Sequence, residues 1–299
     1  MSNLPRVVLT GGVSGGHTFP LIAVARTLQA RYPQGIEFLF IGSEGTFESN
    51  AMSAAGIPVK YVLYGKMRRY FSLLNYLDAF KLPIGFVQAL WHLLWFMPDV
   101  VFSKGGAASV PVVLAARLYR IPVLIHDSDS VAGRANVFLR NFVQKIAIAY
   151  PSAAQFFPAD KTILTGNPVR TEVYSGSVES ARAIFSLAPE KKTILIVGGS
   201  QGARGLNIAV LRTLPALLTK GIQVIHQVGN QNIGDVSALA AELGVPLQGG
   251  DYHPVPFLDP QAIGDAYAAA DLVISRAGAG SIAEIAANKK ALILVPLPS

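Results

Sequence analysis

Two segments of this chain share one design, in which an apolar run passes directly into glycines and then into a helical pattern. The first spans Arg6–His17 and the second spans Lys192–Arg204. The helical patterns that follow are also alike, because Ile22–Leu28 reads IAVARTL and Ile208–Leu214 reads IAVLRTL. A strand that turns through glycines into a helix leaves unbonded backbone N–H groups at the helix start, and the helix dipole adds positive charge there. Two such anion sites in one chain predict two nucleotide-binding-type domains.

Strand-like apolar runs alternate with helical patterns along the whole chain. This alternation is typical of βαβ units, so it predicts an α/β fold with two doubly wound parallel sheets. The segment Thr165–Arg170 has the composition of a turn, and Pro168 biases the preceding Asn167 away from helix. We therefore expect an N-terminal domain over residues 1–165 and a C-terminal domain over residues 166–299. The expected strands are 7–9, 37–41, 59–63, 100–102, 123–125, 145–149, 193–197, 223–227, 272–275 and 291–295.

The composition fits a globular chain with large cores, since 51% of the residues are hydrophobic and 14% are charged. The chain has no cysteine, which excludes disulfides, thiolate metal ligands and cysteine nucleophiles. The N-terminus lacks the apolar stretch of a signal peptide, so we expect a cytoplasmic protein. The formal net charge of +7 makes nucleic acid, an anionic membrane surface and phosphorylated ligands candidate partners.

The segment from Lys60 to Met97 is basic and rich in aromatic residues. Such a surface can bind an anionic bilayer, and we expect Lys66–Leu82 to do so. The run Ile84–Met97 is too short to span a membrane, and we expect it to be a core helix behind that basic segment. Interleaved bases and aromatics also occur in RNA-binding proteins, but no RNA-binding signature is present, and we expect no nucleic-acid partner.

The first glycine turn does not match two common nucleotide-binding motifs. His17 and Thr18 follow Gly16 where a P-loop has Lys and Ser or Thr, and Val13 stands where a dinucleotide-binding turn has its second glycine. Hydrolysis of ATP through a P-loop and simple dehydrogenase chemistry are therefore disfavoured. His17 lies at the expected start of a helix, which lowers the pKa of a histidine and suits a general base, and a capping or packing role is the alternative.

Polar residues also follow the expected strand 123–125, in the order His126-Asp127-Ser128-Asp129. Asp127 and Asp129 could orient a base or hold a sugar hydroxyl. A histidine with two carboxylates also suits a metal, but no second cluster of metal ligands can be matched to it. A polar loop with an Asx-type turn is the simpler alternative.

Three charged residues in the second half have two interpretations each. Ser281 and Glu284 have the spacing of a helix capping box, so Glu284 either ties off a helix or accepts hydrogen bonds from a ribose diol. Arg276 either offsets phosphate charge or is a solvated surface residue. Arg170 either binds a diphosphate through its planar guanidinium or forms an interdomain salt bridge. The residues alone leave these alternatives open.

Taken together, the motifs resemble one family, the bacterial peptidoglycan glycosyltransferase MurG, over nearly the whole chain. The matching segments are Gly11–Pro20, Pro98–Gly106, His126–Gly133, Gly166–Arg170, Gly198–Asn207 and Ser275–Ala287. The resemblance implies the GT-B architecture, two Rossmann-like domains with a cleft between them. It also implies inverting transfer of N-acetylglucosamine from UDP-N-acetylglucosamine to N-acetylmuramyl-pentapeptide on undecaprenyl diphosphate, with no metal or other cofactor. Such enzymes work peripherally at the cytoplasmic face of the inner membrane.

The resemblance also implies roles for individual residues. His17 matches the proposed base for the acceptor hydroxyl, and Asp127 matches a family glutamate that would orient this base. Glu284 matches the ligand of the ribose. The other positions matched to substrate binding are Ser14, Gly15, Gly16, Asp129, Arg170, Ser200, Gln201, Leu258, Ala279, Gly280 and Ser281.

Two features depart from the family pattern. The family has His-Glu-Gln-Asn where this chain has His126 to Asp129, so a carboxylate that cannot donate a hydrogen bond replaces an amide that contacts the sugar. The chain also stops at Ser299, soon after the last expected strand, where the family continues with a further donor-binding segment. From this we expect either a fragment or a chain that cannot bind the donor normally on its own. Another glycolipid-forming GT-B transferase and a nucleotide-sugar-binding membrane scaffold are the alternative functions.

Overall fold

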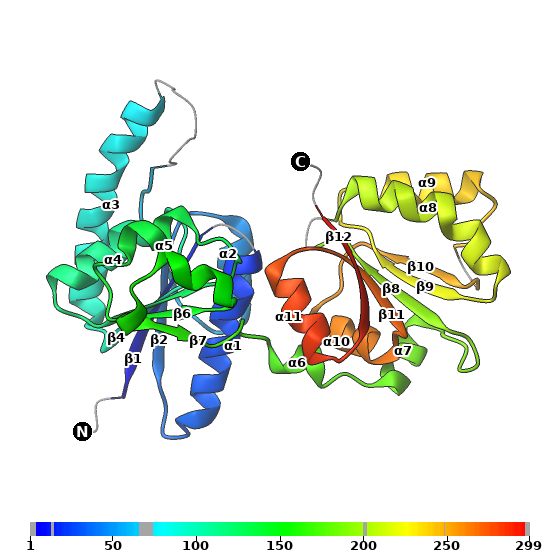
Figure 1. The fold of residues 1–299 in the computed structure, drawn as a ribbon, viewed down its shortest axis with the longest axis horizontal. Coiled ribbons are helices and arrows are strands. Elements are labelled where there is room, and N and C mark those ends of the chain that lie inside the picture. The colour runs from blue at the N-terminus through cyan, green and yellow to red at the C-terminus, as the bar shows by residue number, and fades with distance from the viewer. Residues whose placement is uncertain (1–3, 13–14, 66–73, 200–201, 248, 297–299) are drawn as a thin grey trace. The chain divides into compact units, whose positions relative to one another are not determined.

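The computed structural model describes residues 4–12, 15–65, 74–199, 202–247 and 249–296, with the side chains at 46–47 and 74–80 left out of the description. The chain divides into two units, Met1–Pro168 and Val169–Ser299, each built on its own parallel sheet (Figure 1). Both have the alternating strand and helix order predicted from the sequence, so the α/β fold class is confirmed.

The first unit is a seven-stranded parallel sheet with the order β3-β2-β1-β4-β5-β6-β7. The order reverses direction between β1 and β4, and ligands of open α/β sheets bind outside the carboxyl ends of the strands at such a point. The strands are β1 (Arg6–Thr10), β2 (Glu37–Gly42), β3 (Val59–Tyr61), β4 (Val100–Ser103), β5 (Val123–Asp127), β6 (Lys145–Ile148) and β7 (Thr162–Leu164). The helices are α1 (Gly15–Arg31), α2 (Thr46–Ala54), α3 (Leu74–Phe96), α4 (Ser109–Leu118) and α5 (Arg134–Leu139), with short 3₁₀ turns η1 (Pro151–Phe156) and η2 (Ala159–Lys161).

Side chains of β1 alternate between two cores because successive residues of a strand point to opposite faces of the sheet. Val7 and Leu9 pack with α1 and α2 in one core, and Val8 packs with α3 and α4 in the other. Helices therefore cover both faces, which explains why the strands of this unit read as continuous apolar runs.

The second unit repeats the design with five parallel strands in the order β10-β9-β8-β11-β12. The order again reverses, here between β8 and β11, so the carboxyl ends of these two strands are the expected ligand edge. The strands are β8 (Thr193–Val197), β9 (Gln223–Gln227), β10 (Tyr252–Val255), β11 (Leu272–Arg276) and β12 (Ala291–Val295). The helices are α6 (Thr171–Tyr174), α7 (Val178–Phe185), α8 (Arg204–Thr219), α9 (Ile233–Glu242), α10 (Pro260–Ala269) and α11 (Ala279–Ala287).

This sheet is also covered on both faces, by α8 and α9 on one and by α7, α10 and α11 on the other (Figure 1). Leu195 and Val197 of β8 face the second group, and Ile194 and Ile196 face the first. Strand β12 forms one edge of this sheet, opposite β10, and three of its five side chains are exposed.

Each strand expected from the sequence is present, and two further strands were missed. Strand β7 is a short edge strand with two exposed residues, so it lacks a strong apolar pattern. Strand β10 contains His253 and Pro254, and proline is usually a sign against a strand. Proline is tolerated there because β10 lies at the edge of the second sheet.

The expectation that Ile84–Met97 is a core helix is only half right. It belongs to the longer helix α3, whose inner face packs Ala89 and Leu93 into the first core. The opposite face exposes large apolar side chains, namely Ile84, Val87, Trp91, Leu94 and Trp95. Their spacing places them on one side of the helix, so α3 is apolar on both sides. Among the described residues, no helix is long and apolar enough to cross a membrane.

The turns after β1 and β4 touch through their backbones. A Cβ atom on Gly106 would lie 2.7 Å from the Cα atom of Gly12, and Gly106 has φ of +90°. Glycine is therefore required at position 106 both by its conformation and by the space available.

We predict that Gly106→Ala lowers the free energy of unfolding of the first unit by about 3 kcal/mol. The strain of positive φ at residue 106 and the clash of the new Cβ with the Gly12 backbone both contribute to this loss. Gly56→Ala is the matched control, since Gly56 also has positive φ (+73°) but open space around its missing side chain. We expect that control to cost about 1 kcal/mol. Urea unfolding followed by tryptophan fluorescence measures both, and equal losses would contradict the close approach.

Candidate active site

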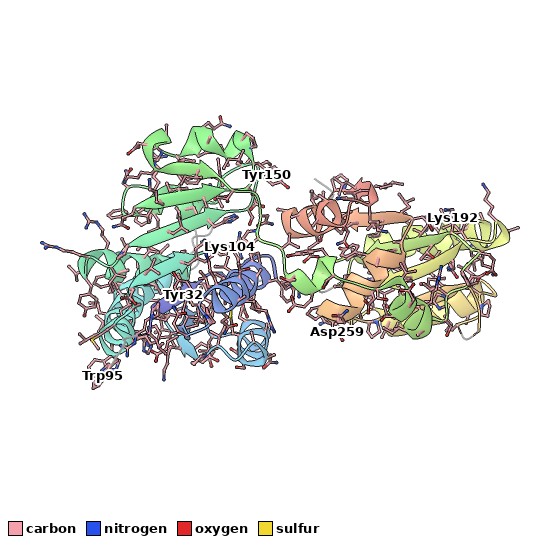
Figure 2. The ribbon with its side chains drawn as sticks, turned by 90° about the horizontal axis from the view of Figure 1, so that it is seen from below. Tyr32, Trp95, Lys104, Tyr150, Lys192 and Asp259 are labelled. Atoms are coloured by element: carbon pink, nitrogen blue, oxygen red, sulfur yellow. The ribbon has the colours of Figure 1, made fainter. Side chains whose placement is uncertain are left out.

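The first group of candidate residues gathers at the carboxyl ends of β1, β4 and β5. His17 lies in the first turn of α1, Lys104 directly follows β4, and His126 and Asp127 are the last residues of β5. Because β1 and β5 both flank β4, their carboxyl ends bring these residues to one edge of the sheet. Lys104 is labelled on this unit in Figure 2. Gly15 and Gly16 begin α1, and Ser14 lies outside the described residues.

Two hydrogen bonds fix the protonation of His126. Its Nε2 lies 2.9 Å from the carbonyl oxygen of Gly166, which can only accept, so Nε2 carries the proton. Its Nδ1 lies 2.8 Å from Nζ of Lys104 and accepts from that ammonium. Burial and the nearby Lys104 charge lower the pKa of His126 to about 4, so the ring is neutral at pH 7.

Asp127 is buried and holds the loop that follows it. Its Oδ1 accepts from the backbone N–H of Asp129 (3.1 Å), and its Oδ2 accepts from the N–H of Gly133 and from Nδ2 of Asn136, both at 2.9 Å. This is the Asx-type turn considered from the sequence, with the helix α5 tied in as well. The Asp127 carboxylate therefore has a structural role in the loop, in addition to its charge at the site.

His17 is held as a neutral imidazole at pH 7. Burial and, to a smaller extent, the charge of Lys104 lower its pKa to about 4, and the charge of Asp127 opposes the shift. A neutral imidazole at the carboxyl edge of a sheet can accept a proton from a substrate hydroxyl.

Asp129 is the residue that departs from the family pattern, and it lies on the exposed part of the loop. Partial burial and the charge of Asp127 raise the pKa of its carboxyl, and Lys104 lowers it. The extra negative charge at this position is thus balanced in part by the buried Lys104, directly after the neighbouring strand β4.

The second group of residues lies in the second unit and centres on a buried ion pair. Nη2 of Arg170 lies 3.2 Å from Oε1 of Glu284, with side-chain exposures of 9% and 18%. Burial raises the pKa of Glu284, and Arg170 and Tyr267 act in the opposite direction. Arg170 therefore forms its salt bridge inside the second unit.

The capping interpretation of Glu284 is wrong. Helix α11 begins after Gly278, and none of the described side chains bonds to the helix start, so Ser281 and Glu284 do not form a capping box. Ala279, Gly280 and Ser281 instead form the first turn of α11, directly after β11. Glu284 lies one turn further along this helix.

The remaining predicted residues of the second unit are placed as follows. Leu258 is buried in the loop before α10, and Arg276 donates from Nη1 to the carbonyl oxygen of Pro296 at 2.8 Å. Ser200 and Gln201 lie outside the described residues. Gly202 has φ of +75° and packs against the Val228 carbonyl, where a Cβ would come within 1.9 Å, so the second glycine turn also needs its glycine.

Two family models match this chain. The glycosyltransferase family 28 N-terminal domain matches residues 7–148, and the C-terminal domain of the same family matches residues 193–299. The chain belongs to glycosyltransferase family 28. It matches both halves of the family in their usual order, and each match lies within one of the two units.

Individual relatives agree with this membership. The chain is 40% identical over 297 residues to a UDP-N-acetylglucosamine--N-acetylmuramyl-(pentapeptide) pyrophosphoryl-undecaprenol N-acetylglucosamine transferase of Phocaeicola vulgatus, covering 98% of this chain and 77% of the relative. It is 37% identical over 294 residues to a transferase of the same name, numbered 2, from Bacillus cereus, covering 98% and 80%. The chain is therefore shorter than these relatives.

Solved structures confirm the fold. The crystal structure of Acinetobacter baumannii MurG matches with a TM-score of 0.69 and 30% identity, covering 98% of this chain and 78% of that one. A UDP-GlcNAc 2-epimerase from Neisseria meningitidis, bound to UDP-GlcNAc, matches with a TM-score of 0.66 at 16% identity, which shows the shared fold alone. The resemblance to the MurG family and the GT-B architecture expected from the sequence are confirmed.

Two residues of the candidate site, Lys104 and Tyr267, were not assigned a role from the sequence. Lys104 is one isolated lysine before two glycines, a pattern that reads as a surface loop. Tyr267 lies in an ordinary apolar helix pattern, and burial beside Glu284 raises the pKa of its phenol. The strand-then-glycine arrangement at Ser103–Gly106 was the available signal for Lys104, since it repeats the design of the first glycine turn.

We predict that Arg170→Met lowers the free energy of unfolding of the second unit by about 3–5 kcal/mol, because it leaves the Glu284 carboxylate buried without a cation. Lys192→Met is the matched control, since its pair with Asp271 has exposures of 77% and 42%. We expect that control to cost at most about 1 kcal/mol. Both tryptophans lie in α3, so urea unfolding of this unit is followed by far-UV circular dichroism. Similar costs for the two variants would contradict the buried pair.

Proposed function

We propose that this chain transfers N-acetylglucosamine from UDP-N-acetylglucosamine to the N-acetylmuramyl-pentapeptide of a lipid-linked diphosphate, the reaction named for its relatives from Phocaeicola vulgatus and Bacillus cereus. The observation that carries the proposal is His17, an imidazole held neutral at the carboxyl edge of the first sheet, where the strand order reverses. Family membership in both halves of the chain supports it.

In the proposed reaction, an acceptor hydroxyl attacks the anomeric carbon of the donor sugar. The new bond forms between the acceptor oxygen and this carbon, the bond to the UDP oxygen breaks, and His17 takes the hydroxyl proton. Attack from the side opposite the leaving UDP inverts the anomeric configuration. His17 is suited to this step because it is unprotonated at pH 7.

The second unit binds the donor in this scheme. Glu284 accepts hydrogen bonds from the ribose hydroxyls, and Arg170 orients this buried carboxylate and opposes the rise in its pKa that burial causes. The backbone N–H groups at the start of α8, directly after the second glycine turn, stabilise the charge that develops on the departing diphosphate. Leu258 and the first turn of α11 complete the set of donor residues.

We expect His17→Gln to lower kcat for sugar transfer by about 100-fold or more, because it removes the proton acceptor. Turnover is measured with UDP-N-acetylglucosamine and a short-chain lipid diphosphate acceptor. Calorimetry with UDP is the control, and its Kd should stay unchanged because Glu284 and Arg170 are intact.

Near-full turnover in His17→Gln would contradict the assignment of His17 as the base. Donor binding by the unaltered chain without any transfer would favour the alternative of a nucleotide-sugar-binding scaffold.

The acceptor's lipid anchor requires the enzyme to reach a membrane surface. We propose that α3 docks on the cytoplasmic face of the inner membrane through its exposed apolar face, with Trp91 (59% exposed) and Trp95 (70% exposed) at its centre. Lys60 and Lys81 are exposed near this face and suit anionic lipid headgroups. Most of the basic segment expected from the sequence to do this, Lys66–Leu82, lies outside the described residues and side chains.

Trp91 and Trp95 are the chain's only tryptophans, so its fluorescence reports directly on this surface. We expect vesicles containing anionic phosphatidylglycerol to shift the emission to shorter wavelength and to co-sediment with the protein. Replacing Val87 and Leu94 by Ser should weaken this binding by about tenfold, because two apolar side chains no longer enter the bilayer. Phe138→Ser, at an exposed position of α5, is the matched control. Unchanged binding of the first variant would contradict the proposed surface.

A further inference from the structure

One buried cation of the first unit has no part in the proposed chemistry. Lys104 is 3% exposed, although lysine is almost never fully buried unless it is paired. Burial lowers its pKa to about 8, and the carboxylates of Asp127 and Asp129 act against this shift. At pH 7 it remains an ammonium inside the site.

Hydrogen bonds lead from this ammonium to the end of the first unit along two paths. In the first, Nζ donates to Nδ1 of His126, whose Nε2–H donates to the carbonyl oxygen of Gly166. In the second, Nζ donates to Oγ of Ser128, which donates to Oδ1 of Asn167 at 2.8 Å. Lys104 therefore holds both the loop after β5 and the segment Gly166–Asn167.

Lys104 also lies next to the proposed base. A Cβ atom on Gly11 would be 3.4 Å from Cβ of Lys104 and 3.5 Å from Cβ of His17. Both side chains therefore begin next to this glycine. The ring of His17 packs in turn on Gly12, where a Cβ would be 3.2 Å from Nδ1. The Lys104 charge lowers the pKa of His17, as the second cause after burial.

We propose that Lys104 is a positioning residue of the transferase, whose hydrogen bonds hold the His126–Ser128 loop in place and whose fixed positive charge tunes the basicity of His17. This inference rests on the proposed function, in which His17 is the base. It also explains why this chain tolerates the additional carboxylate of Asp129, because the buried ammonium balances its charge.

The charged groups around His17 come from several elements. Lys104 follows β4, and its charge lowers the pKa of His17. Asp127 ends β5, and its charge raises that pKa. The neighbouring helix α2 carries the buried Glu48, and His126 of β5 is neutral. Removing the Lys104 charge leaves Asp127 unopposed, so protonation of His17 becomes easier.

We expect Lys104→Met to raise the pKa of His17 from about 4 by about one unit. The pKa is measured by NMR titration of the imidazole Cε1–H signals of the full chain, which has five histidines, with the His17 signal assigned from His17→Gln. Lys145→Met, at an exposed position at the start of β6, is the matched control and should leave the pKa unchanged. An unchanged His17 pKa in a folded Lys104→Met protein would overturn the proposal.

The unaltered chain provides a second test that does not depend on how the variant folds. Because the Lys104 ammonium loses its proton near pH 8, the His17 signal should show a second, smaller inflection there. A His17 signal that is flat between pH 7 and pH 9 would overturn the charge coupling, whatever the variant does.

The pH dependence of sugar transfer distinguishes a failure of this inference from a failure of the proposed function on which it rests. The acid limb of the kcat profile should move up by the same amount, about one pH unit, in Lys104→Met. A shifted His17 pKa with an unmoved acid limb would contradict the assignment of His17 as the base and leave the charge coupling intact. A moved limb and a shifted pKa together support both.

Discussion

The first unit depends on a close approach of two backbones, Gly12 after β1 and Gly106 after β4. This contact lies where the strand order reverses, and it allows the start of α1 to reach the ends of β4 and β5. A side chain at either position would push α1 away from Lys104. The candidate base, the buried cation and the His126–Asp129 loop are neighbours because these two turns carry only hydrogen atoms where they meet.

The two units use the same sheet design but stabilise charge in different ways. In the first unit, an ammonium is surrounded by neutral imidazoles and by a loop that Asp127 holds through three N–H donors. In the second unit, an arginine and a carboxylate neutralise each other in a buried pair. The Lys104 ammonium disfavours a second positive charge, so it helps to keep the free imidazole of His17 unprotonated, and Asp127 and Asp129 partly offset it. A neutral pair suits the unit that recognises the hydroxyls of a ribose.

Much of the fold follows from the sequence because strands buried on both faces read as continuous apolar runs. The edge strands β7 and β10 were missed because an edge strand need not be apolar and tolerates Pro254. The His17 and Glu284 positions were found through their motifs and the family resemblance. The burial of Lys104 was not, since it depends on β1, β4 and β5 lying side by side, and the strand-then-glycine arrangement at Ser103–Gly106 marks only the end of a strand. The outer face of α3 was missed for the opposite reason, because an apolar helix pattern does not reveal that no element among the described residues covers one of its sides.

Strand β12 has a consequence for work with this chain in solution. Within the described part of the chain it is an edge strand, whose outer row of backbone N–H and C=O groups pairs with no other strand, and it exposes Ile293 and Leu294. An edge of this kind can template the addition of a strand from another molecule. Self-association driven by β12 would rise with protein concentration and would be independent of lipid. Detergent would cover the apolar side chains of Ile293 and Leu294 but would not prevent the backbones from pairing. Dilution is therefore the better way to keep the molecules separate.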